Sequence, residues 1–264
     1  MEINFYKYQG SGNDFIILDN RSNEFENLNA EQVKKMCDRK FGIGADGLMM
    51  MNNKHEYDFE MKYFNADGNA STMCGNGGRC MVRFAFNMGL HKYTYKFWAV
   101  DGEHEAEIDN HNMIRLKMNN VTHVEYHNGH AILDTGSPHF VKHVSDIMNV
   151  DVVETGRDIR ESKEFAESGI NVNFVESIDD DSIFVRTYER GVEDETLSCG
   201  TGLTAAALIS SHNELGFNRV KVRTLGGHLS VEYNKISDTQ FEDIWLCGPA
   251  EQVFKGAVEV DLTI

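Results

Sequence analysis

The second half of this sequence repeats the first at a nearly constant spacing, and this repeat is the strongest constraint on the fold. Three residues recur 125 positions later: Phe59 as Phe184, Tyr63 as Tyr188 and Cys74 as Cys199. Gly10-Ser11 recurs as Gly136-Ser137, shifted by 126. Because the offset holds across a strand, a turn and the entrance of a helix, it predicts two copies of one α/β unit.

Each copy carries a cysteine at the entrance of a predicted helix. The two corners read Cys74-Gly75-Asn76-Gly77 and Cys199-Gly200-Thr201-Gly202, and an apolar run follows each. Unpaired N–H groups and the helix dipole at such an entrance favour a thiolate over a thiol. The glycines leave N–H groups uncovered, so the same corner can bind a carboxylate. Two corners in one chain predict a single site with two sulfurs.

The predicted fold class is α/β (α+β) with two pseudo-symmetric domains. We place the N-terminal half, with Cys74, at residues 1–120 and the C-terminal half, with Cys199, at 121–264. The boundary follows from the repeat, because only two prolines are present and no proline-rich linker separates the halves. The pattern also allows a terminal strand, about 253–264, to return to the first half.

Local patterns predict the individual elements. Alternation favours a strand at 57–64, and Asn29 with Gln32 predicts a capping box at a helix start. Further expectations are a hairpin turn at Asp101-Gly102, a short helix at 161–168, a turn at Asn234-Lys235, and a loop that holds His139 beside Pro138.

Charge and hydropathy restrict the partners. The net charge of −17 argues against nucleic acid or an anionic membrane, either of which needs a basic face, but it allows a small zwitterion. No apolar run reaches the length of a membrane span, and no leader pattern is recognisable. We therefore expect a cytoplasmic protein with a small-molecule substrate.

The five cysteines do not form a dense disulfide framework, so we expect reduced thiols. Cys37, Cys80 and Cys247 are expected to be core residues. Cys74 and Cys80 have the spacing C-x5-C, which suits zinc poorly, so no metal is expected. The glycine-rich run at 42–47 is a weak nucleotide signature, because it does not clearly follow a strand or open a helix.

Two opposed thiols suit a reaction that removes a proton from one face of a carbon and delivers another to the opposite face. One must be thiolate while the other is thiol, and like charges resist joint ionisation, so the pair titrates as a unit. The helix N–H groups can stabilise charge that builds up during deprotonation. Such a reaction requires no pyridoxal phosphate, and we expect no cofactor.

Polar residues beside the two corners are candidates for binding the substrate: Asn13, Asn65, Asn76, Ser137, Asn171, Glu189 and Arg190. Any single asparagine is more commonly a turn residue that bonds its own backbone. The joint placement of these residues at strand ends around both cysteines favours a site. Arg190 can bind a carboxylate through two hydrogen bonds, whereas His139 alone fits a structural role as well as a functional one.

The motifs resemble those of the diaminopimelate epimerase family over nearly the whole chain. The similarity rests on 64–68, 73–80, 188–191 and 195–202, with support from 12–15, 42–47, Pro138-His139 and 248–250. It implies a cofactor-independent isomerase that interconverts LL- and meso-diaminopimelate for lysine and peptidoglycan synthesis. The implied fold is two domains, each a curled, mostly antiparallel sheet around a central helix, in a homodimer.

The resemblance also implies roles for residues. Cys74 and Cys199 would be the acid–base pair, and Gly75-Asn76 with Gly200-Thr201 would supply N–H groups to the α-carboxylate. Five residues would line the substrate site, and His139 with Glu189 would tune the thiols; the five are Asn13, Asn65, Asn171, Glu189 and Arg190.

Two positions depart from the family pattern. Ser137 stands where the family usually has asparagine, and a serine reaches less far and lacks the paired donor and acceptor of an amide. The stretch 192–194 is one residue longer than usual. Both are expected to touch the distal end of the substrate, so they bear on substrate choice.

Three other functions compete with this interpretation. A racemase of another amino acid, such as histidine or proline, would keep both cysteines and change the distal contacts. A thiol redox or metal-binding protein would leave the glycine-rich corners without a purpose, and a metal assay with thiol titration separates it from an epimerase. A cysteine hydrolase would need only one cysteine.

Overall fold

The computed structural model describes residues 1–210 and 214–260. It divides into two compact units: unit 1 comprises Met1–Leu116 with Pro249–Ile264, and unit 2 comprises Lys117–Gly248. The described residues form seventeen strands and four α-helices, which confirms the expected mixed α+β fold. None of the helices in those residues is long and apolar enough to cross a membrane.

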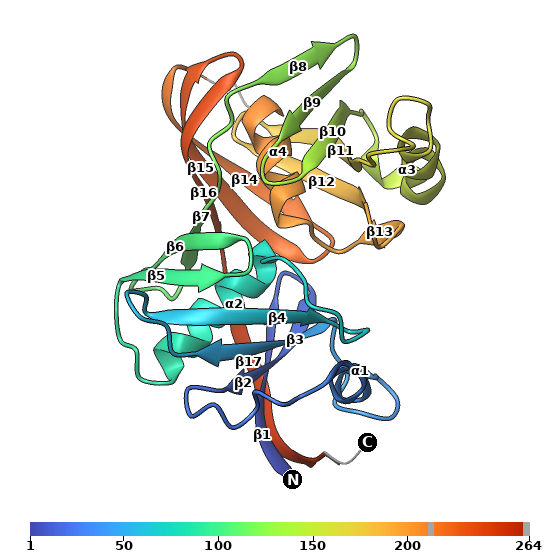
Figure 1. Cartoon of the computed structure of the whole chain (residues 1–264). Helices are drawn as coiled ribbons and strands as arrows, with labels where there is room; N and C mark the ends of the chain where they lie inside the picture. Colours follow the sequence, from blue (N-terminus) through green and yellow to red (C-terminus); the bar gives the residue numbers. More distant parts are fainter. Residues whose placement is uncertain (211–213, 261–264) are drawn as a thin grey trace. The chain divides into compact units, whose positions relative to one another are not determined.

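Unit 1 is a curled sheet with two helices, α1 (Ala30–Cys37) and α2 (Gly75–Asn87). Neighbouring strands are antiparallel except β2 with β3 and β4 with β5, which are parallel. The strands follow in this order across the sheet: β17 (Glu251–Glu259), β1 (Glu2–Gly10), β2 (Asn13–Asp19), β3 (Gly47–Asn52), β4 (Phe59–Asn65), β5 (Thr94–Ala99), β6 (Gly102–Ile108) and β7 (Ile114–Lys117) (Figure 1).

Unit 2 repeats this plan strand for strand. Its parallel pairs, β10 with β11 and β12 with β14, stand at the same places as those of unit 1. The order is β8 (Val124–His127), β9 (His130–Asp134), β10 (Pro138–His143), β11 (Asn171–Asp179), β12 (Ser182–Glu189), β14 (Gly216–Thr224), β15 (Gly227–Ser237) and β16 (Gln240–Gly248), with β13 (Asp194–Thr196) added beside β12. The matching order confirms the two pseudo-symmetric domains. The helices are α3 (Val152–Arg160) and α4 (Gly200–Ser210), with a short 3₁₀ turn at Ile147–Asn149.

The sheet of each unit wraps around one central helix. In unit 1, α2 contacts β1, β2, β3, β6 and β17, and its Phe84 is fully buried. In unit 2, α4 contacts strands from β9 to β16, and Ala205, Ala206 and Ala207 are fully buried. The alanine side chains are short, so the strands of the sheet can approach this helix closely.

The predicted capping box at the start of α1 is confirmed. The side chain of Asn29 accepts a hydrogen bond from the backbone N–H of Gln32 at 3.0 Å, and the Gln32 side chain accepts from the backbone N–H of Asn29 at 2.9 Å. This reciprocal pair satisfies two N–H groups that the helix leaves open. The apolar face of α1 packs through Val33, Met36 and Cys37.

The prediction of a helix at 161–168 is wrong. Those residues form turns, and the helix lies just before them, in α3, where the Asp151 side chain caps the N–H of Glu154 at 2.9 Å. A valine pair and Gly156 disfavour a helix in this segment by propensity. Packing requires the glycine, because a Cβ at Gly156 would come within 2.4 Å of the Tyr188 Cβ.

Two predicted turns are also displaced. Ala99 pairs with Gly102, so the hairpin loop is Val100 and Asp101, one residue earlier than expected. Asn234-Lys235 lies inside β15 and not in a turn. The register of β15 against β16 shifts on both sides of this pair, so a bulged strand accommodates the polar residues that suggested a turn.

Candidate functional site

Both cysteine corners open helices, as predicted. Cys74 is the N-cap residue of α2, with φ −95° and ψ 131°, and its carbonyl accepts from the N–H of Gly78 at 2.7 Å. Cys199 directly precedes α4, and its carbonyl accepts from the N–H of Leu203 at 2.9 Å. The Cys199 side chain is buried, with Sγ 3.5 Å from the Thr201 hydroxyl, whereas Cys74 is partly exposed.

In unit 1 a chain of amide hydrogen bonds leads to the first turn of α2. Asn13 donates from Nδ2 to Asp46 Oδ2 at 2.9 Å, and its Oδ1 accepts from Asn76 Nδ2 at 2.7 Å. The Asn76 Oδ1 in turn accepts from the buried guanidinium of Arg79 at 3.0 Å. Arg79 also donates to the Ser11 hydroxyl at 2.9 Å and to the carbonyl of Gly75 at 3.3 Å. The orientations of the Asn13 and Asn76 side-chain amides are therefore defined by these hydrogen bonds.

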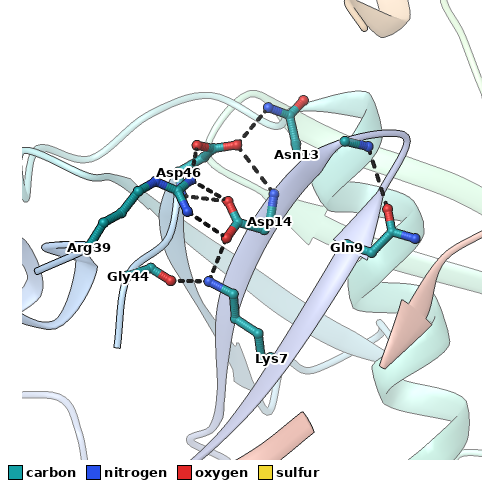
Figure 2. Close-up of polar contacts among 8 residues, drawn as sticks. Lys7, Gln9, Asn13, Asp14, Arg39, Gly44 and Asp46 are labelled. Carbon is teal, nitrogen blue, oxygen red and sulfur yellow. Dashed lines mark hydrogen bonds and ion pairs between the residues drawn. The ribbon is translucent and has the colours of Figure 1, made fainter. Parts of the chain in front are cut away.

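Asp46 belongs to an ion-pair network that sequence reasoning missed, and Figure 2 shows it beside Asn13. Arg39 binds both oxygens of Asp14 at 3.0 and 2.6 Å and contacts Asp46 at 2.7 Å. Lys7 Nζ lies 2.7 Å from Asp14 Oδ2 and also donates to the carbonyl of Gly44. The side chain of Lys7 is buried, so this network stabilises the loop that carries Asp46.

We expect unit 1 to lose stability in acid. Although partial burial acts in the opposite direction, the hydrogen bonds and charges of Arg39 and Lys7 lower the pKa of Asp14 from 3.8 to about 2. Because the carboxylate is favoured in the folded state, its contribution is present above about pH 4 and is lost as the pH falls towards 2. The shift corresponds to about 2 kcal/mol of unfolding free energy.

Denaturant unfolding between pH 2 and pH 6 measures this effect. The Asp14→Asn variant should be less stable at pH 6 and should show a shallower fall in this window. Glu2→Gln in the same unit is the matched control, since Glu2 is exposed. Parallel pH curves for Asp14→Asn and the unsubstituted protein would contradict the prediction.

Strand register brings Asn65 to the same edge of the unit 1 sheet as Asn13. Gly47 pairs with Phe15 on one side and with Asn65 on the other. The start of β2, the start of β3 and the end of β4 therefore lie together, next to the entrance of α2. Asn13, Asn65, Gly75 and Asn76 are all placed near this edge with Cys74.

In unit 2 the structure gathers three of the predicted residues. Asn171 donates from Nδ2 to the Ser137 hydroxyl at 2.9 Å and to the Pro138 carbonyl at 3.1 Å. Its Oδ1 accepts from the backbone N–H of Arg190 at 2.9 Å, and the Arg190 guanidinium reaches Ser137 Oγ at 3.4 Å. Arg190 also donates to the carbonyl of Ser168 at 3.2 Å. This cluster presents a cation and a hydroxyl at one place.

The remaining candidates of unit 2 adjoin this cluster or the second corner. Glu189 is the last residue of β12 and directly precedes Arg190. Thr201 is held in the first turn of α4, where its carbonyl accepts from the Thr135 hydroxyl at 2.8 Å. The carbonyl of Gly200 accepts from the Thr204 hydroxyl at 3.0 Å.

The longer stretch 192–194 is stabilised by Glu193. Its carboxylate accepts from the N–H of Gly191 at 3.0 Å and from Tyr188 Oη at 3.1 Å.

The placement of His139 in a loop is wrong, because the residue lies in β10 and is fully buried. Its Nδ1 is 3.1 Å from Asn173 Nδ2, a contact that the sequence did not reveal. Burial, reinforced by the positive charge of Arg190, lowers the pKa of His139 to about 3. The imidazole is therefore neutral at ordinary pH.

The other cysteines are core residues, as predicted. Cys37, Cys80 and Cys247 are buried thiols that take part in no disulfide among the described residues, and burial raises the pKa of Cys37 to about 11 and that of Cys80 to about 12. Thiols with such pKa values are inert at neutral pH. Within the described residues, no three or more His, Cys, Asp or Glu side chains gather as a metal site would require.

Solved structures share this fold. A phenazine biosynthesis protein of the PhzF family from Bacillus anthracis matches with a TM-score of 0.74 at 15% identity, covering 98% of this chain and 100% of that one. A probable proline racemase from Agrobacterium radiobacter K84 matches with a TM-score of 0.68 at 14% identity, covering 98% and 93%. The chain is thus a two-domain protein of the fold that these structures share.

Sequence comparison identifies the family. The family model described as diaminopimelate epimerase matches residues 5–124 and 131–251. The chain is 46% identical to the diaminopimelate epimerase of Flavobacterium psychrophilum, covering 96% of this chain and 99% of that protein, and 43% identical to that of Chlorobaculum tepidum, covering 94% and 98%. The chain belongs to the diaminopimelate epimerase family, which confirms the resemblance seen in its motifs.

Proposed function

We propose that this protein interconverts LL- and meso-diaminopimelate without a cofactor, with Cys74 and Cys199 as the acid–base pair. The observation that carries the proposal is the family match over almost the whole chain, in a molecule that begins each central helix directly after a cysteine. Each of the two units carries one of these cysteines.

The chemistry follows from the two helix entrances. One cysteine, as thiolate, removes the proton from the α-carbon, and the other, as thiol, delivers a proton to the opposite face. Negative charge develops on the α-carbon and its carboxylate between these steps. The N–H groups of Gly75-Asn76 and Gly200-Thr201 bind that carboxylate, where the helix dipoles stabilise the added charge. Tuning of the thiols by His139 and Glu189 belongs to this proposal.

The polar residues would hold the rest of the substrate. Arg190, with Ser137 and Asn171 around it, supplies a cation and polar groups suited to a second amino-carboxylate end. Asn13, Asn65 and Glu189 complete the proposed set. A cation held beside a hydroxyl favours a substrate with two amino-acid ends over one with a plain side chain, such as proline.

We expect Ser137→Ala to weaken substrate binding more than turnover. The hydroxyl accepts from both Asn171 and Arg190, so its loss removes the bond from Asn171 and the longer one from Arg190, which loosens the guanidinium. A neutral hydrogen bond contributes about 1 kcal/mol, which corresponds to a rise in KM of about fivefold. Steady-state kinetics measure this change. Ser237→Ala in unit 2 is the matched control, and a fall in kcat with unchanged KM would contradict the assignment.

The proposed activity is tested by incubating the purified protein in deuterium oxide with LL-diaminopimelate, meso-diaminopimelate, proline and histidine. We expect interconversion of the diaminopimelate isomers with one deuterium gained at the α-carbon, and no exchange with the other amino acids. Exchange with proline or histidine alone would assign the chain to another racemase. No exchange with any of them would refute the acid–base proposal.

We further propose that the protein works as a cytoplasmic homodimer in lysine and peptidoglycan synthesis, which is supported by its family membership. Sedimentation of the native protein measures its mass. A single species of one chain at concentrations used for the kinetic assay would contradict the dimer.

A further inference from the structure

The buried amide of Asn173 lies beside His139 in unit 2 and has three hydrogen-bonding neighbours. Its Nδ2 is 3.2 Å from the carbonyl oxygen of Phe140 and 3.1 Å from His139 Nδ1. Its Oδ1 accepts from the Thr187 hydroxyl at 2.9 Å. Asn173 is fully buried, so these neighbours satisfy the amide without water.

The carbonyl of Phe140 decides which way this amide points. A carbonyl oxygen only accepts, so the amide atom that faces it must be the donor Nδ2. The reversed amide would place two oxygens 3.2 Å apart, whereas the Thr187 hydroxyl can donate as well as accept. The second N–H of Nδ2 then donates to His139 Nδ1, which must carry a lone pair and no proton.

A neutral imidazole without a proton on Nδ1 carries it on Nε2. The His139 ring is neutral, because burial and Arg190 hold its pKa at about 3. Its buried Nε2 finds no hydrogen-bond partner among residues 1–210 and 214–260. A buried donor without a partner costs about 1–3 kcal/mol of folding free energy. Such unsatisfied groups are typical of residues with a catalytic or binding role.

The first turn of α4 lies against this pair. A Cβ at Gly202 would come within 2.3 Å of Asn173 Oδ1 and 3.4 Å of His139 Cε1. Cε1 lies between the two ring nitrogens, and Nδ1 faces Asn173, so the edge of the imidazole that carries both nitrogens lies against the turn that begins directly after Cys199. Gly202 is the residue that allows this close approach.

We propose that Asn173 is a positioning residue that fixes His139 as the Nε2–H tautomer, so that the imidazole presents a proton donor to an anion held at the first turn of α4. Thr187 supports the amide from the other side. The role of this donor in turnover rests on the proposed epimerase activity, but the tautomer itself does not. His139 then stabilises negative charge at this turn and does not act as a base there.

Nitrogen-15 NMR of the native protein labelled at histidine tests the tautomer directly. The chain has eleven histidines, and the signal absent from His139→Gln assigns the ring. We expect a neutral ring with the proton on Nε2, unchanged down to about pH 4, one unit above its pKa of about 3. A proton on Nδ1, or a charged ring at pH 7, would overturn the proposal whether or not the protein is an epimerase.

Two variants then test Asn173 itself. In Asn173→Ala the donor to Nδ1 is lost, so we expect a mixture of tautomers, and in Asn173→Asp the carboxylate draws the proton to Nδ1. Each should lower kcat by about 10- to 100-fold with less than about a threefold change in KM. Asn120→Ala is the matched control, because Asn120 is exposed and lies in the same unit.

Each outcome bears on the proposal. A tautomer that does not change in Asn173→Ala would overturn the role of Asn173. A changed tautomer with unaltered kcat would overturn its link to the reaction. If Asn173→Asp does not fold, the spectrum of the native protein and that of Asn173→Ala still decide both points.

Discussion

Cys74→Ala and Cys199→Ala will each abolish epimerisation, with turnover lowered by at least about a thousandfold. Under the proposed mechanism each variant keeps one of the two sulfurs and lacks either the group that removes the proton or the group that returns one. In the proposed mechanism the remaining thiol acts on one face of the α-carbon, so it should exchange the α-hydrogen of one stereoisomer with solvent without inverting it. We expect the two variants to exchange opposite stereoisomers.

Mass spectrometry and chiral analysis of substrate recovered from deuterium oxide measure both parts of this result. Cys247→Ala is the matched control, since Cys247 is a buried thiol whose Sγ lies 3.8 Å from the carbonyl of Trp245 and is not assigned to the reaction. Near-normal turnover in either single variant would exclude the two-base scheme. Exchange of the same stereoisomer by both variants would show that the sulfurs do not act on opposite faces.

Gly202→Ala will destabilise unit 2 and lower activity, although alanine is normally the better helix residue by about 1 kcal/mol. The added Cβ would lie 2.3 Å from Asn173 Oδ1, so the amide or the helix must shift. The Asn173 amide is hydrogen-bonded to Thr187, Phe140 and His139. It therefore cannot move away from the new Cβ as the end of a flexible side chain could. Overpacking of this kind costs about 1–3 kcal/mol, and a displacement of about 1 Å at a catalytic group costs about 100-fold in rate.

Denaturant unfolding and steady-state kinetics measure the two effects. Gly77→Ala is the stability control, because it adds the same Cβ to the first turn of α2, where the closest atom is the Met49 sulfur at 3.1 Å. A thioether on a flexible side chain can move away, so Gly77→Ala should be close to neutral in stability. If Gly202→Ala is as stable and as active as the unsubstituted protein, the close packing of Gly202 against Asn173 contributes to neither stability nor activity.

The repeat and the two helix entrances could be predicted from the sequence because each depends on local signals. Asn29 and Gln32 carry a complete capping box within four residues, and glycine directly after Cys74 and Cys199 indicates a helix start. The segment 152–160 shows where such signals fail. Its Gly156 argues against a helix locally, yet the position must be glycine because Tyr188, 32 residues later, packs against it.

The candidate site could be predicted only in part, because only some of its residues carry a local signal. Ser137, Asn171 and Arg190 could be proposed because they lie at strand ends. Asn173 shares a strand face with Asn171, two residues before it, and this parity was the one signal that could have revealed it. No local signal links Arg79 to Ser11, 68 residues away, or Asp46 to Arg39 and Asp14, since these contacts arise from tertiary packing.

The pairing of β17 with β1 affects when the sheet of unit 1 can be completed during translation. β17 pairs with β1 along its length, from Glu2 opposite Glu259 to Gln9 opposite Glu251, so two strands that are translated far apart in time are neighbours in one sheet. Unit 2 is continuous and lies between β1 and β17 in the sequence, so it is translated in full before β17. The nascent chain therefore carries an open β1 edge until β17 has left the ribosome, and the sheet of unit 1 is completed only then. Variants truncated before Glu251 would leave that edge permanently exposed to pairing with other chains.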